Sequence, residues 1–406
     1  MSKLEELIKE LCPNGVKFKS LGEITDFRNG KGHEKNISED GDFIVINSKF
    51  ISTEGAVYKH SEMQIVPLYK DEIVMVMSDL PNGKALAKCY LIESDSKYTL
   101  NQRIGGFKVH ETVVFPKFLF YVLNRNYQLL KYDNGVDQTN LRKDDILKIK
   151  IPVPPMEVQC EIVRILDNFT ELTAELTAEL TARKKQYEYY RQCILNNAKD
   201  VQLKTLGEVC DFVRGPFGGS LKKEIFKDNG YAVYEQQHAI YGNLDFRYFV
   251  DKAKYLSMKR FAIKPGDLIM SCSGTMGKIF IIPENAPEGI INQALLKLSP
   301  KNDVIIGKYL KYCFEDKITQ IMNSNARGGA IKNVASVEIL KAIKINVPTI
   351  KEQERIVSIL DRFDALCNDL SIGLPAEIEA RKKQYEYYQD KLLTFEPIQL
   401  TEKELA

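Results

Sequence analysis

The hydrophobic pattern of residues 162–194 alternates between steps of four and three positions. Such a heptad seam, kept over several turns and surrounded by charged residues, predicts a long helix that packs against another long helix. A second seam occupies residues 356–392, so the natural partner of each predicted helix is the other one. The first seam consists of Ile162, Leu166, Phe169, Thr173, Leu176, Leu180, Tyr187, Tyr190 and Ile194, with Arg183 filling its one gap. The second consists of Ile356, Leu360, Phe363, Cys367, Leu370, Leu374, Ile378, Arg381, Tyr385, Tyr388 and Leu392.

The two seams belong to a duplication that extends over the whole chain. The eight residues Arg-Lys-Lys-Gln-Tyr-Glu-Tyr-Tyr stand unchanged at 183–190 and at 381–388. Internal repeats at this scale decide the architecture before any single motif does. Similar opening segments at Val16 and Val201 show where each half begins.

The second helical stretch has four more residues before its copy of the octapeptide than the first. The surplus contains Gly373 and Pro375, and proline both removes a helix hydrogen bond and clashes with the preceding turn. We therefore expect a kink or a short break near residues 373–375.

Between its opening segment and its helix, each half contains short alternating apolar runs separated by Gly, Asn and Pro turns. This pattern is typical of β-rich domains. The sequence therefore predicts an α+β fold with two β-rich domains in pseudo-twofold repeat and two long paired helices. The expected parts are a first domain at 1–152, a first helix at 153–198, a second domain at 199–348, a second helix at 349–395 and a C-terminal tail at 396–406.

Composition limits the class of protein. With 406 residues and a formal net charge of +2, the chain is long enough for two domains and is almost neutral. Such a chain does not hold nucleic acid through charge alone, so any nucleic-acid surface has to be local. The eight cysteines show neither paired nor metal-ligand spacing, and we find no signal peptide or apolar run of membrane length. We expect a reduced, cytoplasmic protein that binds no metal.

Three motifs that are similar to catalytic or nucleotide-binding signatures are better explained as structure. Gly277-Lys278 lacks the first glycine and the following Ser or Thr of a phosphate-binding loop. Pro154-Pro155 lies in a Val-Pro-Pro-Met context before a predicted helix, whereas a methyltransferase needs an Asn- or Asp-Pro-Pro-aromatic motif. Glu377 and Glu379 lie beside the second seam and read as a solvated helix face rather than as nuclease carboxylates. The sequence therefore predicts no catalytic site.

The strongest candidates for DNA contact are polar, basic loops flanked by glycine. Arg and Lys meet phosphates or guanine edges, while Asn and Gln suit the paired donor and acceptor of adenine in the major groove. An ordinary solvated loop is the competing interpretation for each residue taken singly. The dipeptides Asn101-Gln102 and Asn292-Gln293 recur in both halves, which favours a shared structural role for them. The candidates are Arg28, Lys31, His33, Lys35, Asp137, Gln138, Thr139 and Asn140 in the first half, and Arg214, Lys222, Lys223, Arg327, Lys332 and Asn333 in the second.

The tyrosines of the repeated octapeptide are candidates for a partner-docking surface. Three tyrosines so closely spaced cannot all face one helix seam, so some amphipathic rings remain outside it, as interfaces favour. A purely structural spacer is the competing interpretation. Because the surface is duplicated, it indicates two copies of one partner. Its residues are Tyr187, Tyr189, Tyr190, Tyr385, Tyr387 and Tyr388.

Taken together, these features resemble the specificity subunits of type I restriction-modification systems. The resemblance covers the whole chain and rests on residues 4–16, the Leu-Gly-Glu segments, Ser273-Gly274-Thr275-Met276-Gly277-Lys278 and the doubled octapeptide. It implies two target-recognition domains, each reading one half of a bipartite, asymmetric DNA sequence and held apart by two antiparallel coiled-coil helices. Those helices would also dock two methyltransferase (modification) subunits, which bind S-adenosylmethionine and methylate adenine. Restriction subunits that use ATP and Mg complete such an ensemble, and this chain would be its non-catalytic reader.

Two other classes of function remain open from the sequence. One is a scaffold or adaptor whose β-rich domains bind protein or RNA, with the helices as a spacer. The other is an enzyme that acts alone on DNA, and the lack of cofactor, ATP and metal motifs argues against it. Co-purification with a methyltransferase, followed by mapping of methyladenine, distinguishes the adaptor from a specificity subunit.

Overall fold

The computed structural model describes residues 3–81, 83–198, 200–273, 275–325, 336–368 and 372–398. The chain forms two compact units, one made of residues 1–177 and 377–406 and the other of residues 178–376. Each unit therefore combines one β-rich half with parts of the helical stretches.

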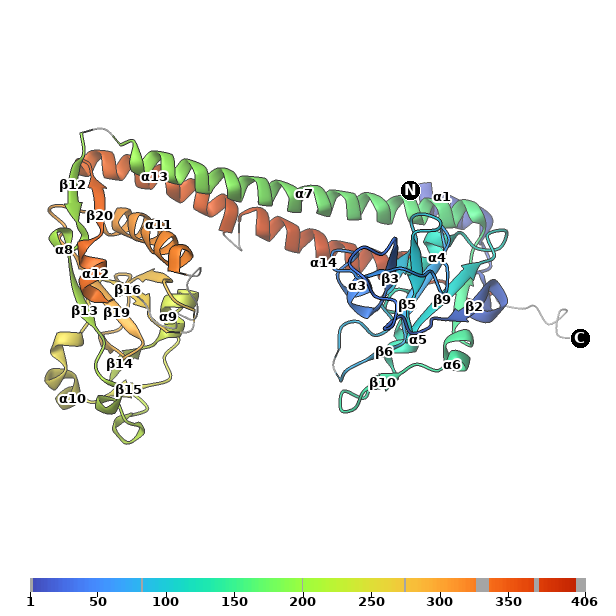
Figure 1. The fold of residues 1–406 in the computed structure, drawn as a ribbon, viewed down its shortest axis with the longest axis horizontal. Helices are drawn as coiled ribbons and strands as arrows, with labels where there is room; N and C mark the ends of the chain where they lie inside the picture. Colours follow the sequence, from blue (N-terminus) through green and yellow to red (C-terminus); the bar gives the residue numbers. More distant parts are fainter. Residues whose placement is uncertain are drawn as a thin grey trace, which may run out of the picture. The chain divides into compact units, whose positions relative to one another are not determined.

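The strands of the first unit form a four-stranded sheet, a three-stranded sheet and two short ladders. They are β1 (Lys17–Ser20), β2 (Thr25–Asn29), β3 (Phe43–Ile46), β4 (His60–Ser61), β5 (Ile73–Val76), β6 (Ser78–Asp79), β7 (Cys89–Leu91), β8 (Tyr98–Leu100), β9 (Ile104–Val109), β10 (Thr139–Asn140) and β11 (Lys150–Val153). The antiparallel sheet has the order β2-β9-β5-β7 and the smaller sheet the order β4-β3-β8, while β1 pairs with β11 and β6 with β10. Figure 1 labels β2, β9 and β5 of the larger sheet, β3 of the smaller one, and the pair β6 and β10. The helices are α1 (Lys3–Leu11), α2 (Leu21–Ile24), α3 (Ser48–Ser52), α4 (Pro116–Leu123), α5 (Tyr127–Leu130), α6 (Lys143–Leu147), the first part of α7 (Met156–Asn196) and most of α14 (Leu374–Leu393).

The second unit repeats the four-stranded sheet, the three-stranded sheet and the ladder that β1 and β11 form in the first unit. Its strands are β12 (Gln202–Thr205), β13 (Cys210–Arg214), β14 (Tyr231–Tyr234), β15 (Phe249–Val250), β16 (Leu268–Ser271), β17 (Ile279–Ile281), β18 (Gly289–Ile291), β19 (Leu295–Pro300) and β20 (Lys344–Val347). They pair as β13-β19-β16-β17, β15-β14-β18 and β12-β20. The helices are α8 (Leu206–Val209), η1 (Gly218–Ser220), η2 (Lys223–Ile225), α9 (Gln236–Tyr241), α10 (Lys252–Ser257), η3 (Lys259–Phe261), α11 (Gly307–Asn325), α12 (Val337–Ala342), α13 (Ile350–Asn368) and the rest of α7.

Each four-stranded sheet is buried on both faces because its strands carry apolar residues at successive positions. In β5, Ile73 and Met75 pack in one core while Val74 and Val76 pack in another. Successive strand residues point to opposite faces, which explains the division. In β16 the same division separates Leu268 and Met270 from Ile269.

A buried glutamine fixes the start of each long helical stretch to its β-rich half. Gln159 of α7 accepts a hydrogen bond from the Phe115 N–H at 2.7 Å and donates to the Pro154 carbonyl at 2.8 Å. These bonds satisfy backbone groups that would otherwise be buried without a partner. The second unit repeats the arrangement with Gln353, Ile306 and Pro348.

An aspartate two turns further along each helix makes a second shared attachment. Asp167 accepts hydrogen bonds from the Tyr121 hydroxyl at 2.5 Å and from the Lys117 ammonium at 2.7 Å. Burial, followed by this hydrogen bond, raises the pKa of Tyr121, so the phenol remains a donor. The second unit uses Asp361, Tyr312 and Lys308 in the same way.

Within each unit, two helices pack through aromatic rings of the heptad seam. In the first unit Phe169 of α7 stacks on Tyr388 of α14, with ring centroids 5.4 Å apart. In the second, Phe363 of α13 stacks on Tyr187 and Tyr190 of α7, with centroids 6.2 and 6.3 Å apart. An early segment of α7 thus meets a late segment of α14, as antiparallel pairing requires. The predicted α+β fold with two β-rich repeats and long antiparallel helices is confirmed.

The second helical stretch is divided, because α13 ends at Asn368 and α14 begins at Leu374. Pro375 therefore occupies an early position of α14, where the missing N–H has no helical carbonyl to bond. By contrast, α7 is one continuous helix. Within its residues 171–182, the seam side chains of Thr173, Leu176 and Leu180 are partly buried, and the others are exposed to solvent.

Candidate nucleic-acid interface

The first predicted DNA loop leaves the end of β2 and packs tightly on the turn before β9. The Gly30 N–H donates to the Ile104 carbonyl and the Lys31 N–H to the Leu100 carbonyl, both at 3.1 Å. A Cβ atom on Gly30 would lie only 1.9 Å from the Asn101 carbonyl oxygen. A side chain at position 30 is therefore incompatible with this packing, which explains the glycine.

The turn at residues 101–103 connects this loop to the second predicted segment, residues 137–140. The Gln102 N–H donates to the Lys31 carbonyl at 3.1 Å, and the Met77 N–H donates to the Arg103 carbonyl at 3.0 Å. Met77 leads into β6, which pairs with β10 (Figure 1). The Gln138 side chain then donates to the Ser78 hydroxyl at 2.7 Å. Two segments about a hundred residues apart in the chain thus form one continuous surface.

The polar candidates of this surface divide by exposure. Five of them are exposed, namely Lys31, Lys35, Asp137, Gln138 and Asn140. His33 and Thr139 are buried instead, and the His33 ring nitrogens lie 2.7 Å from the Lys31 carbonyl and 2.8 Å from the Thr99 hydroxyl. Both side chains are buried under their loops, whereas the sequence analysis proposed them for contact with DNA.

Arg28 also has a structural partner. Its guanidinium pairs with the carboxylate of Glu72, which is 5% exposed and also accepts the Tyr69 N–H at 3.0 Å. Burial raises the pKa of Glu72, while the Tyr69 amide and the Arg28 charge oppose that rise. The positive charge of Arg28 is therefore paired with the buried carboxylate of Glu72.

The second unit carries a cation in this part of its sheet on β19 instead of β13. The registers of β2 on β9 and β13 on β19 place Val213 where the first unit has Arg28, and Lys297 where it has Gly106. Lys297 is buried, and its pKa is lowered by burial while the buried Asp267 opposes that shift. The second unit thus has a buried cation at the position of Gly106, and its ammonium donates to the Ala262 carbonyl at 2.5 Å.

Arg103 is an exposed cation that sequence reasoning did not single out. It lies between the 28–35 loop and β6, and its backbone has the left-handed φ of 65°. That conformation is uncommon outside glycine. The usable signal was the position after the shared Asn-Gln dipeptide, which holds Arg103 in one half and Ala294 in the other.

The second unit builds the same loop arrangement with other side chains. The Gly215 N–H donates to the Leu295 carbonyl at 2.9 Å, and a Cβ on Gly215 would lie 1.8 Å from the Asn292 carbonyl oxygen. The shared Asn-Gln dipeptides therefore have a shared structural role. Three sequence candidates of this unit are exposed, namely Arg214, Lys222 and Lys223. The remaining candidates, Arg327, Lys332 and Asn333, lie outside the described residues.

The tyrosines of the octapeptide form two groups, one packed in the helix seam and one exposed on the helix surface. Tyr187 is buried, Tyr385 is partly buried, and burial raises the pKa of each to about 12. Tyr190 and Tyr388 stack on phenylalanines of the seam. Tyr189 and Tyr387, at equivalent positions, are 65% and 62% exposed. Any docking through this block therefore centres on these two rings.

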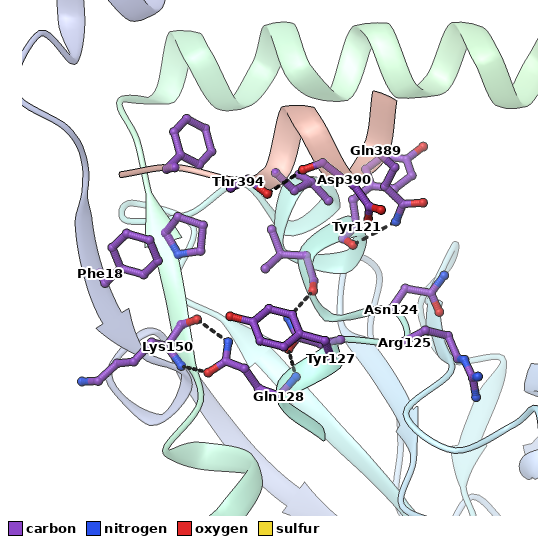
Figure 2. Close-up of a pocket in the computed structure, with 15 residues that line it drawn as sticks. Phe18, Tyr121, Asn124, Arg125, Tyr127, Gln128, Lys150, Gln389, Asp390 and Thr394 are labelled. Atoms are coloured by element: carbon purple, nitrogen blue, oxygen red, sulfur yellow. Dashed lines mark hydrogen bonds between the residues drawn. The ribbon is translucent and has the colours of Figure 1, made fainter. Parts of the chain in front are cut away.

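A pocket of about 270 Å³ lies elsewhere in the first unit, between α4, α5 and the end of α14 (Figure 2). Gln128 bonds both backbone groups of Lys150 there, and the Thr394 hydroxyl donates to the Asp390 carbonyl. Pro152 lines the pocket, whereas its counterpart Asn346 donates to the carbonyls of the last turn of α7, both at 3.2 Å. The pocket thus opens where the first unit lacks that side-chain cap.

Three further properties bear on the class of protein. Among the described residues, no group of three or more His, Cys, Asp or Glu side chains is placed to hold a metal ion. Among the helices of that part of the chain, none has the length and apolar character needed to cross a membrane. All eight cysteines are free.

Comparisons with known proteins agree with one another. The family described as "Type I restriction modification DNA specificity domain" matches residues 13–183 and 198–380. A Haemophilus influenzae protein named as a type I restriction enzyme specificity subunit is 32% identical over 345 residues, covering 80% of this chain and 84% of that protein. The specificity subunit of an Escherichia coli type I restriction enzyme is 36% identical over 259 residues, covering 61% of this chain and 63% of its own length.

Solved structures share the fold. A chain from a study of complex assembly and conformational transition of a type I restriction-modification system matches with a TM-score of 0.68 at 16% identity. It covers 94% of this chain and 98% of its own length. The Mycoplasma genitalium S subunit matches with a TM-score of 0.52 at 15% identity over 95% of this chain and 97% of its own.

Proposed function

Because the chain belongs to the family of type I restriction-modification DNA specificity subunits, we propose that it reads a bipartite, asymmetric DNA target with one unit per half-site. The observation that carries the proposal is one loop scaffold that occurs twice with different side chains. Gly30 and Gly215 pack on equivalent asparagine carbonyls, whereas Arg103 in one unit is replaced by Ala294 in the other. A shared scaffold with divergent side chains suits two different base sequences.

Exposure and chemistry support a division of the contacts within the first unit. Lys31, Lys35 and Arg103 are exposed cations that suit phosphates or guanine edges. Gln138 and Asn140 are exposed amides that suit the adenine edge. In the second unit we assign phosphate and base contacts to Arg214, Lys222 and Lys223, with Arg327, Lys332 and Asn333 retained from the sequence.

The helices supply the partner surface in this proposal. Tyr189 and Tyr387 are exposed at equivalent places of a duplicated motif, which suits two copies of one methyltransferase subunit. The chain itself is a non-catalytic reader that acts in the cytoplasm. S-adenosylmethionine, ATP and Mg are used by its modification and restriction partners.

The first test is co-expression with the candidate methyltransferase, co-purification, and sequencing of methyladenine positions in DNA exposed to the complex. A complex that methylates one bipartite motif supports the proposal. A chain that binds no methyltransferase and selects RNA or another protein supports the adaptor instead.

A paired substitution tests the division of labour. Changing Gln138→Ala and Asn140→Ala together is expected to relax one half of the methylated motif and leave the other intact, because both amides belong to one unit. The expected loss is about 1–3 kcal/mol for each base contact removed. Equal loss in both halves, or none in either, contradicts it.

A further inference from the structure

The loop that follows β13 presents one aromatic ring almost entirely to solvent. Phe217 is 92% exposed, although Pro216 before it and Leu221 after it are buried. The Ser220 N–H closes the turn by donating to the Phe217 carbonyl at 2.8 Å. The ring is therefore held outward by a loop that is anchored on both sides.

This ring lies on the surface assigned to DNA. It follows by two residues Gly215, which packs on the Asn292 carbonyl, and the exposed Arg214, Lys222 and Lys223 flank it in the sequence. Residues 214–224 carry three cations and one acid, a net charge of 3 − 1 = +2. A locally positive loop is drawn to the phosphate backbone, which places its apolar tip against a groove.

The first unit has no such ring at the equivalent place. The correspondence of Gly30 with Gly215 puts Gly32 where Phe217 stands. The two units therefore differ at this position by the presence of one large apolar side chain, and any reading by it belongs to the second unit alone.

We propose that Phe217 reads the 5-methyl group of a thymine in the half-site of the second unit. The inference rests on the proposed function, since it names a determinant of that same surface. Phenylalanine is one of the side chains that contact the thymine methyl in the major groove, where cytosine, adenine and guanine present no methyl group. The contact needs no hydrogen bond, so an isolated ring on a basic loop is sufficient for it.

The test removes the methyl group from the DNA and the ring from the protein. The complex of the full chain with its methyltransferase partners is measured for affinity on its methylome-defined target, with each thymine of the second half-site replaced in turn by deoxyuridine. One such replacement is expected to weaken binding about three- to fivefold, the contribution of one buried methyl group. Phe217→Ala is expected to weaken binding to the thymine target by at least that factor and to abolish the deoxyuridine effect at the same position.

A matched variant and a separate readout keep the outcomes distinct. Tyr241→Ala removes another ring of the second unit, 76% exposed on α9, and is expected to retain the full deoxyuridine effect. If no thymine in that half-site is sensitive, or if Phe217→Ala stays sensitive, the methyl-reading role is overturned while specific methylation by the unmodified complex upholds the proposed function. A wild-type complex without specific methylation overturns the proposed function itself.

Discussion

Deletion of Glu175–Ala178 from α7 is expected to shorten the gap between the two half-sites by one or two base pairs and to leave both half-site sequences unchanged. These residues form one of three successive Glu-Leu-Thr-Ala units within a single uninterrupted helix. Four residues contribute about 6 Å of helix rise and advance the helical face by about 40° beyond a full turn. DNA rises about 3.4 Å per base pair, so one or two base pairs is the available response.

The geometry of the partner helices makes this change tolerable. Because α13 and α14 are separate helices, each can follow its own part of α7 after the deletion. Removing two or three residues instead leaves the face about 160° or 60° short of a full turn, and activity should be lost. The measurement is the methyladenine motif of each deletion variant. An unchanged gap with retained activity in the four-residue variant contradicts the role of the helices as a spacer.

Arg28→Ala is expected to lower the free energy of unfolding of the first unit by about 3–5 kcal/mol, because it leaves the buried carboxylate of Glu72 without its cation. The effect should depend on pH. Since the folded-state pKa of Glu72 is already raised and rises further without Arg28, the folded state gains a proton more readily than the unfolded state. The deficit is therefore largest above that raised pKa and shrinks as the pH falls through it.

The second unit provides the control for this prediction. Combining Arg28→Val with Gly106→Lys copies the pair Val213 and Lys297, and should recover part of the lost stability because a lysine at that position interacts electrostatically with the buried acid in the second unit. Denaturant unfolding of the single and double variants gives the comparison. An Arg28→Ala protein as stable as the wild type, with weakened DNA binding only, would instead make Arg28 a DNA ligand.

The duplication made much of the fold predictable. Two copies of one pattern predicted two β-rich domains and two long paired helices, and Gly373 with Pro375 marked the stretch at which α13 and α14 divide. Helix periodicity also indicated that some octapeptide rings leave the seam, but not which ones. Only packing identifies Tyr189 and Tyr387 as the exposed pair.

The candidate interface was predictable in part. The polar and basic character of the loops pointed to residues 28–35 and 137–140. That these two segments lie together depends on the pairing of β6 with β10. Both strands are too short to show a hydrophobic pattern in the sequence. In the sequence, His33 is simply a polar residue of a loop. Its burial involves a contact with Thr99 on β8, which is distant in the chain and therefore not visible in the local sequence. Arg103 was missed although it follows the shared Asn-Gln dipeptide directly, and its left-handed backbone φ of 65° is not predictable from the local sequence.

The assignment of one unit to each half-site can be tested with methyladenine maps of Gly30→Ala and Gly215→Ala in the complex with the methyltransferase. Each added Cβ meets an asparagine carbonyl oxygen at 1.9 or 1.8 Å and must displace its own loop scaffold. Gly307→Ala is the matched control, since it lies in α11, outside the loops assigned to DNA, and a Cβ there meets no atom nearer than 3.5 Å. The two glycine variants are expected to degrade opposite halves of one bipartite motif, and the control is expected to degrade neither half. Loss of the same half in both variants, or a single undivided motif in the wild type, contradicts it.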